Sequence, residues 1–131
     1  MAQERTSDGY SGGAGYRFEL PMKLPSLNEY INACRGNAYA GAQMKKRCQR
    51  DISWFLRDVP KFDGAVEVHF HWVEENRRRD LDNVAFAKKF ILDAMVAAGV
   101  LKDDSRRYVA GFTDTFGYGK EAKVVVEIKN A

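Results

Sequence analysis

Two aspartates separated by a single residue form the part of the sequence best suited to chemistry. Asp80 and Asp82 flank Leu81 within the charged run 77–83. In extended backbone, alternate side chains project to the same side, so both carboxylates can converge while Leu81 points into the core. Converging carboxylates repel each other, and a hard divalent cation relieves that repulsion. Magnesium suits such a site because it prefers oxygen ligands and keeps water molecules that a substrate phosphate can displace.

Each of these features also has a simpler explanation. The Asp-x-Asp pattern is common, and aspartate and asparagine are favoured helix N-caps, a role that Asp82 or Asn83 could fill. A second acidic pair, Asp103-Asp104, could be an ordinary solvated turn. The arginines before Asp80 could be a solvated strand end. The metal-site hypothesis therefore depends on these features occurring together.

The elements that position the aspartates follow from the spacing of apolar residues. Alternation predicts four strands, at about residues 16–20, 66–72, 108–112 and 124–128. Helical spacing predicts two helices, at about residues 40–58 and 83–98, the second closed by Gly99. The segment 21–39, with its prolines, glycine and asparagines, is predicted to be irregular. The result is an α+β fold, a small mixed β-sheet with two helices in the order β-α-β-α-β-β.

The bulk properties indicate one domain in a cytoplasmic protein. The chain has 131 residues, and its net charge of +3 is too small to indicate nucleic-acid binding by itself. Residues 1–15, rich in glycine and serine, are predicted to lack fixed structure, and residues 16–131 to form the domain. No apolar run follows Met1, so we expect neither export nor a membrane span, and reduced Cys34 and Cys48.

Several other kinds of site are not indicated. Cys34 and Cys48 have no second cysteine pair, which excludes the usual zinc spacing. His69 and His71 share one face of a predicted strand, but no third ligand stands near, so we expect them on an exposed sheet face. No glycine-rich loop precedes a helix in the way that phosphate binding needs, so no nucleotide cofactor is expected.

The ordered run from Arg79 to Asp104 resembles the signature of the RusA-type Holliday-junction resolvases. It contains Arg79-Asp80-Leu81-Asp82-Asn83, then a lysine with Leu92-Asp93-Ala94-Met95, then Gly99 and Asp103-Asp104. The resemblance is close over residues 77–105 and looser at both ends. It implies a RusA-like fold and an endodeoxyribonuclease that cuts four-way DNA junctions symmetrically in recombination and repair. It also implies dependence on Mg2+, with Mn2+ as a possible substitute.

The resemblance assigns roles to individual residues. Asp80, Asp82 and Asp104 correspond to the metal ligands of the family, although Asp103 could share in binding. The family's catalytic lysine stands four residues after the second aspartate, where this chain has Phe86.

Lys89 is the preferred catalytic lysine because its spacing to Asp93 equals that of the family. Seven residues separate it from Asp82, which returns it to nearly the same side of a helix, whereas Lys88 lies about 100° away. An ion pair between Lys89 and Asp93 at i+4 is the competing structural explanation.

DNA contacts and assembly complete the expectations. Arg77, Arg78 and Arg79 are expected to grip phosphate oxygens, and Lys46 and Arg50 to extend this track along the first helix, where a solvated face is an equal alternative. A junction has two strands to cut, which favours a twofold homodimer.

Three other functions stay open. The chain could be a nuclease for other branched phage DNA, a junction-binding protein that does not cut, or a dimeric structural protein whose carboxylates only cap and solvate.

Overall fold

The alternating apolar residues form four strands of one mixed sheet. The structure, a computed structural model, describes residues 15–131. Its strands are β1 (Tyr16–Leu20), β2 (Val66–Glu74), β3 (Val109–Tyr118) and β4 (Lys123–Asn130), in the spatial order β1-β4-β2-β3. β4 runs antiparallel to both β1 and β2, whereas β3 pairs parallel with β2. The predicted mixed sheet is confirmed, and β3 extends well beyond its predicted end.

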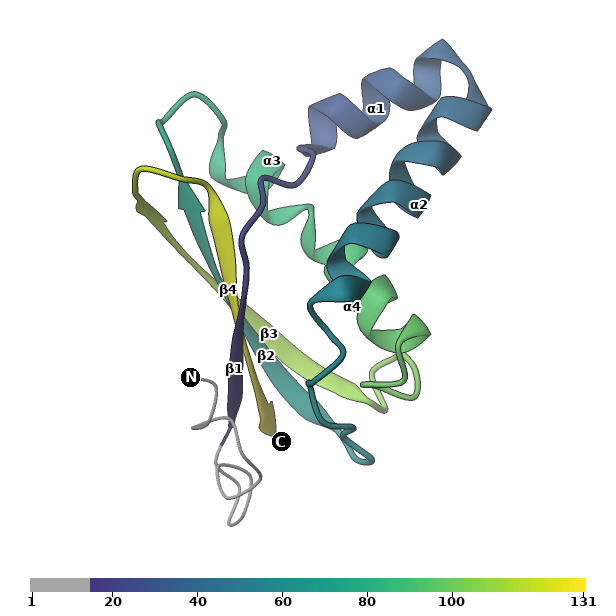
Figure 1. Ribbon diagram of the computed structural model, residues 1–131, viewed down its shortest axis with the longest axis vertical. Coiled ribbons are helices and arrows are strands. Elements are labelled where there is room, and N and C mark those ends of the chain that lie inside the picture. Colours follow the sequence, from purple (N-terminus) through teal and green to yellow (C-terminus); the bar gives the residue numbers. More distant parts are fainter. Residues whose placement is uncertain (1–14) are drawn as a thin grey trace.

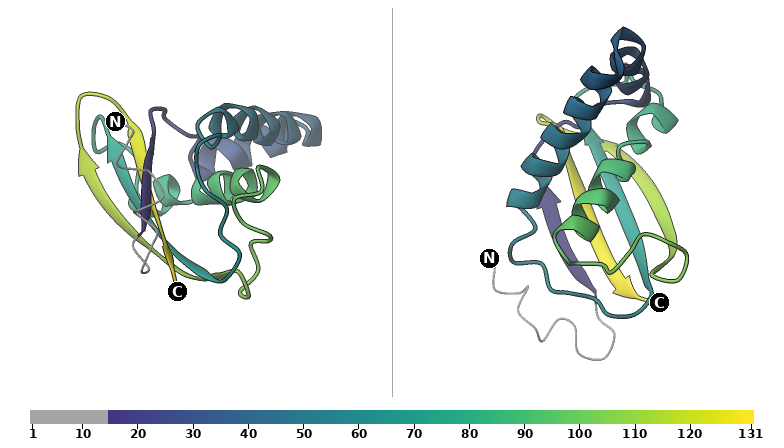
Figure 2. Two further views of the ribbon diagram at one scale, coloured as in Figure 1. Left: turned by 60° about the horizontal axis from the view of Figure 1, so that its bottom comes forward. Right: turned by 90° about the vertical axis from the view of Figure 1, so that its right-hand side faces the viewer.

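Strands β1, β2 and β3 all run in the same direction, and two helical connections join them in sequence, from β1 to β2 and from β2 to β3. The first contains α1 (Leu27–Gly36) and α2 (Ala38–Trp54), and the second contains α3 (Leu81–Ala85) and α4 (Lys88–Ala97). The predicted order β-α-β-α-β-β is therefore confirmed, with a pair of helices in each helical position. Both pairs lie on the same face of the sheet, and the α1–α2 hairpin projects beyond the sheet (Figures 1 and 2).

Helix α1 corrects the expectation that residues 21–39 are irregular. Ser26 is its N-cap, and the side-chain oxygen of Ser26 accepts a hydrogen bond from the backbone N–H of Glu29. The Glu29 carboxylate in turn accepts from the backbone N–H of Ser26 at 2.8 Å. This reciprocal capping box satisfies backbone donors locally, so the helix forms although none of its residues is buried.

The second helical connection is anchored firmly on the sheet. The single helix predicted at 83–98 is interrupted at Phe86–Ala87, and Gly99 closes α4 with a φ of 82°. The backbone N–H of Val100 donates to the carbonyl of Met95 at 2.9 Å, completing a Schellman cap and confirming the predicted role of Gly99. Phe90, Ile91, Ala94 and Met95 of α4 are buried.

The core lies between the sheet and these helices. Its largest fully buried side chains include Phe70 of β2, Leu20 of β1 and Ile91 of α4. Cys34 and Cys48 are both free thiols, and burial raises the pKa of Cys48 to about 11. The predicted lack of structure in residues 1–15 falls almost wholly outside the described residues. Within the described part, no helix is long and apolar enough to cross a membrane.

Candidate active site

Asp80 stands at the junction between the loop after β2 and helix α3. It occupies the N-cap position with extended backbone, and its side chain makes no capping hydrogen bond. Asp82 follows in the first turn of α3, and both residues are exposed. The simpler explanation, that Asp82 or Asn83 caps the helix, is therefore wrong, because both residues lie inside α3 and the N-cap position belongs to Asp80.

Asp82 faces a surface hollow of about 440 Å³ between α3 and the outer strand β3. Lys88 and Asp114 line the same hollow, together with Leu81, Phe86 and Phe116. The Lys88 ammonium lies 2.6 Å from Oδ2 of Asp114. The hollow thus combines two carboxylates, one cation and an apolar floor.

Asp104 approaches the start of α4 within the same chain. Its Oδ2 lies 4.0 Å from Nζ of Lys89, which also lies 3.3 Å from Oδ1 of Asp93. The carboxylate of Asp103 instead accepts a hydrogen bond from the backbone N–H of Asp104 at 2.8 Å. Of the acidic pair, it is therefore Asp104 that reaches the Lys89 ammonium, at the point where this ammonium also contacts Asp93.

Phe86, at the position where the resemblance predicts a lysine, packs with other aromatic rings. Its ring centroid lies 5.6 Å from that of Tyr30 and 5.5 Å from that of Phe90. This cluster joins α1 to the second helical connection. This position is therefore part of the apolar packing, and the next lysines along the chain, Lys88 and Lys89, stand two and three residues farther.

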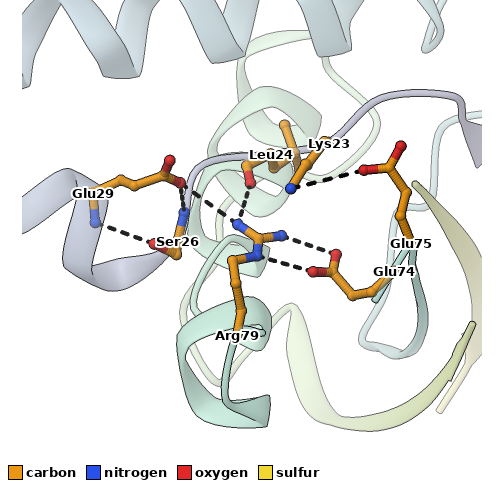
Figure 3. Close-up of polar contacts among 7 residues, drawn as sticks. All are labelled: Lys23, Leu24, Ser26, Glu29, Glu74, Glu75 and Arg79. Carbon is orange, nitrogen blue, oxygen red and sulfur yellow. Dashed lines mark hydrogen bonds and ion pairs between the residues drawn. The ribbon is translucent and has the colours of Figure 1, made fainter. Parts of the chain in front are cut away.

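Arg79 is held by a network between the two helical connections (Figure 3). Its Nε and Nη2 donate to the two carboxylate oxygens of Glu74 at 2.9 Å each, and its Nη1 donates to the carbonyl of Leu24 at 3.0 Å. Oε1 of Glu29 lies 3.6 Å from Nη1 of Arg79. The guanidinium thus ties the end of β2 to the segment before α1, and its predicted contact with DNA phosphate stays a prediction.

The other predicted phosphate contacts are exposed at the surface. Arg77 stacks over the ring of Tyr118 at 4.9 Å, and Arg78 lies beside it in the same loop. Lys46 and Arg50 lie on exposed positions of α2, where Arg50 forms a 3.5 Å ion pair with Asp51. These side chains are sterically available for binding a polyanion.

His69 and His71 lie on the face of the sheet opposite the helices. Their Nδ1 atoms are 2.6 Å from the hydroxyl oxygens of Thr113 and Thr115 respectively. The pair therefore lies on a sheet face, as expected, but both side chains are half-buried there and not fully exposed.

The donor chemistry of the site suits magnesium, although its ligands are sparse. In residues 15–131, no three histidine, cysteine or acidic side chains gather closely enough to hold a metal ion. The structure thus places Asp82 in one hollow with Lys88 and Asp114, and Asp104 near Lys89, but does not assemble Asp80, Asp82 and Asp104 as one cluster. Magnesium tolerates such a site because it commonly binds through one or two carboxylates plus substrate phosphates.

Sequence reasoning missed Asp114. Its partners Lys88 and Trp72 stand 26 and 42 residues away, so no local spacing in the sequence announces the contact. Only the parallel pairing of β2 with β3 brings Asp114 beneath the start of α4.

The structure is an α+β domain whose exposed carboxylates and lysines have the chemistry needed to bind a metal ion and phosphate esters. A family profile described as Endodeoxyribonuclease RusA matches residues 1–129. The chain therefore belongs to the RusA family of junction-resolving endonucleases, which confirms the resemblance found over residues 77–105. Among curated proteins, none matches the chain significantly.

Proposed function

We propose that this chain resolves four-way DNA junctions by two symmetric phosphodiester cuts that require Mg2+. The observation that carries the proposal is the hollow at the start of the second helical connection, where Asp82 and Lys88 share one surface. Membership of the RusA family supplies the substrate class, and the exposed basic residues supply surfaces for its phosphates. A cytoplasmic location is part of the proposal.

The proposed ligands of the metal are Asp80, Asp82 and Asp104. Magnesium, or manganese in its place, would supply activation of water and polarisation of the scissile phosphodiester when bound. The carboxylates of Asp80 and Asp82 are close in sequence, exposed, and not used as caps, so they are free to take a cation together with substrate oxygens. Asp104 belongs to the loop after α4, and its carboxylate lies 4.0 Å from the Lys89 ammonium.

Lysine and arginine side chains would act on the phosphates. Lys89, beside Asp104, is proposed to stabilise negative charge that develops on the scissile phosphate. Arg77 and Arg78 are proposed to position the strand, and Arg79 to fix the loop that carries them while lending its charge to the same surface. Lys46 and Arg50 would extend this contact along α2.

The proposed assembly is a twofold homodimer. A junction presents two strands related by approximate twofold symmetry, and each chain supplies one candidate site. Sedimentation of the full chain, alone and with a junction, checks this part of the proposal: a monomer on the junction would contradict it.

The decisive experiment compares cleavage of a synthetic four-way junction with cleavage of a linear duplex of the same sequence. Wild type, Asp82→Asn and Asp63→Asn are each assayed with Mg2+ and with chelator. Asp63 is a matched control because it precedes β2, at the opposite end of that strand from Asp82. We expect Mg2+-dependent cutting of the junction by wild type and Asp63→Asn, and loss of cutting in Asp82→Asn.

The other outcomes are equally informative. Cutting at the wild-type rate by Asp82→Asn would contradict the assigned site. Tight junction binding without cutting by wild type would favour a junction-binding protein, and preferential cutting of flaps or Y-shaped DNA would favour another branched substrate.

A further inference from the structure

Lys88 is held more tightly than a surface lysine usually is. Its ammonium lies 2.6 Å from Asp114 and 4.3 Å from the centroid of the Phe112 ring. The side chains of Lys88 and Asp114 are only 17% and 20% exposed, so solvent screens their attraction less than it does at an open surface. A short charge-assisted contact beside an aromatic ring therefore fixes the position of this cation.

Asp114 is itself fixed from the core. The indole Nε1 of Trp72 donates to Oδ1 of Asp114 at 2.8 Å, while Oδ2 faces Lys88. Trp72 is 2% exposed and stacks on Phe70, so its ring cannot move without disturbing the core. The contacts thus form a chain from a buried ring, through a carboxylate, to an ammonium.

The adjacent lysine has a different environment. Lys89 is 53% exposed, with Asp93 and Asp104 as its neighbours. Of the two lysines, only Lys88 lines the hollow that contains Asp82. The two lysines therefore have different neighbours on α4, and Lys88 is the one that contacts a strand residue, Asp114.

We infer that Asp114, anchored by Trp72, is a positioning residue that fixes the Lys88 ammonium beside Asp82, where it contacts the scissile phosphate. The inference rests on the proposed function and adds a second cation to it. Asp114 places the charge before the substrate arrives, so binding does not have to order a flexible side chain. Removal of one preorganised charge-stabilising donor costs about 10²–10³ in rate, and misplacement of such a group also slows reaction.

The test uses the full chain with Lys88→Ala, Asp114→Asn and the double variant. Single-turnover cleavage of a four-way junction is measured with Mg2+, and the Kd for the junction is measured with Ca2+ in place of Mg2+. Asp114→Asn keeps an oxygen for Trp72 and removes only the charge that faces Lys88. Glu19→Gln is the control, because Glu19 pairs with Lys123 on other strands at 3.3 Å and leaves the hollow untouched.

We expect Lys88→Ala to slow cleavage by about 10²-fold and Asp114→Asn by about tenfold, while the Kd changes much less than the rate. The double variant should be no slower than Lys88→Ala, because Asp114 acts through Lys88. Glu19→Gln should cleave as wild type does.

Three results would overturn the inference. The first is cleavage by Lys88→Ala at the wild-type rate. The second is multiplication of the two single effects in the double variant. The third is an increase in the Mg2+ concentration that cleavage requires, seen when Asp114→Asn is made in wild type and again when it is added to Lys88→Ala. That result would make Asp114 a metal ligand. If wild type itself leaves the junction whole, the proposed function fails; if Asp82→Asn alone loses cleavage, only this inference fails.

Discussion

The two helical connections do the same topological task with different physical means. Each joins two parallel strands and lies on the same face of the sheet (Figure 2). In the second connection, α4 buries four of its ten residues, whereas α1 in the first buries none. The first is held instead by a capping box, by packing of α1 on α2, and by the late half of α2, which buries Ile52.

This difference matches a difference in what the two connections carry. Asp82 and Lys88 belong to the connection that packs on the core. Buried neighbours on α3 and α4 hold their backbone positions in place. Lys46 and Arg50 belong to the projecting hairpin, where long-range attraction to phosphate does not require a fixed position. In the proposed function, chemistry that depends on distance would thus lie on the anchored connection, and electrostatic binding of DNA would lie on the projecting one.

The sharpest test of this contrast is the same substitution in both connections. Ile91→Ala in α4 removes a fully buried side chain and should lower the free energy of unfolding by about 2–5 kcal/mol. Ile31→Ala in α1, where the side chain is only half-buried, should cost less than about 1 kcal/mol. Urea denaturation of the full chain measures both; equal costs would mean that the hairpin is as firmly anchored as α4.

The network around Arg79 predicts the next largest effect, because it ties the two connections together (Figure 3). Glu74→Gln removes the charge that pairs with Arg79, whose side chain is 17% exposed, and should destabilise the fold by about 1.5–3 kcal/mol. Glu19→Gln breaks an exposed ion pair and should cost at most about 1 kcal/mol. Thermal unfolding distinguishes them; similar losses would show that Arg79 is not a structural tie.

The sequence predicted those parts of the fold that leave local signals, and it missed features of both helical connections. The strands and Gly99 were found because alternation and a left-handed cap leave local signals. Helix α1 was missed because prolines and glycine dominated the interpretation, although Ser26 and Glu29 already had capping-box spacing. The interruption at Phe86–Ala87 has no proline or glycine to announce it.

The candidate site divided in the same way. Asp80, Asp82 and Asp104 were found through a local motif, and their roles as ligands stay predictions. Asp114 could not be found, since its contacts with Lys88 and Trp72 exist only after β3 has paired with β2. Long-range pairing leaves no periodic signal in the sequence.

The hairpin charges should affect binding through salt dependence. If Lys46 and Arg50 each contact a phosphate, Lys46→Ala/Arg50→Ala should lower the slope of log K against log salt concentration by about 2. Lys129→Ala, on the helix-free face of the sheet, should leave the slope unchanged. Measuring junction binding at several salt concentrations gives the slope. An unaltered slope in the double variant would show that Lys46 and Arg50 face solvent and do not contact phosphates.

The smallest expected effect concerns the packing that holds the hairpin together. Gly41 of α2 is buried against α1, and a Cβ at this position would collide with Sγ of Cys34 while lying 3.6 Å from Cβ of Cys34. Alanine favours a helix over glycine by about 1 kcal/mol, but the collision offsets this gain. Gly41→Ala should therefore stabilise the Cys34→Ala protein by up to about 1 kcal/mol and the wild-type protein by less. Urea denaturation of the four proteins gives the coupling, and an equal gain in both backgrounds would show that Cys34 yields freely and that α1 does not restrict α2 at this contact.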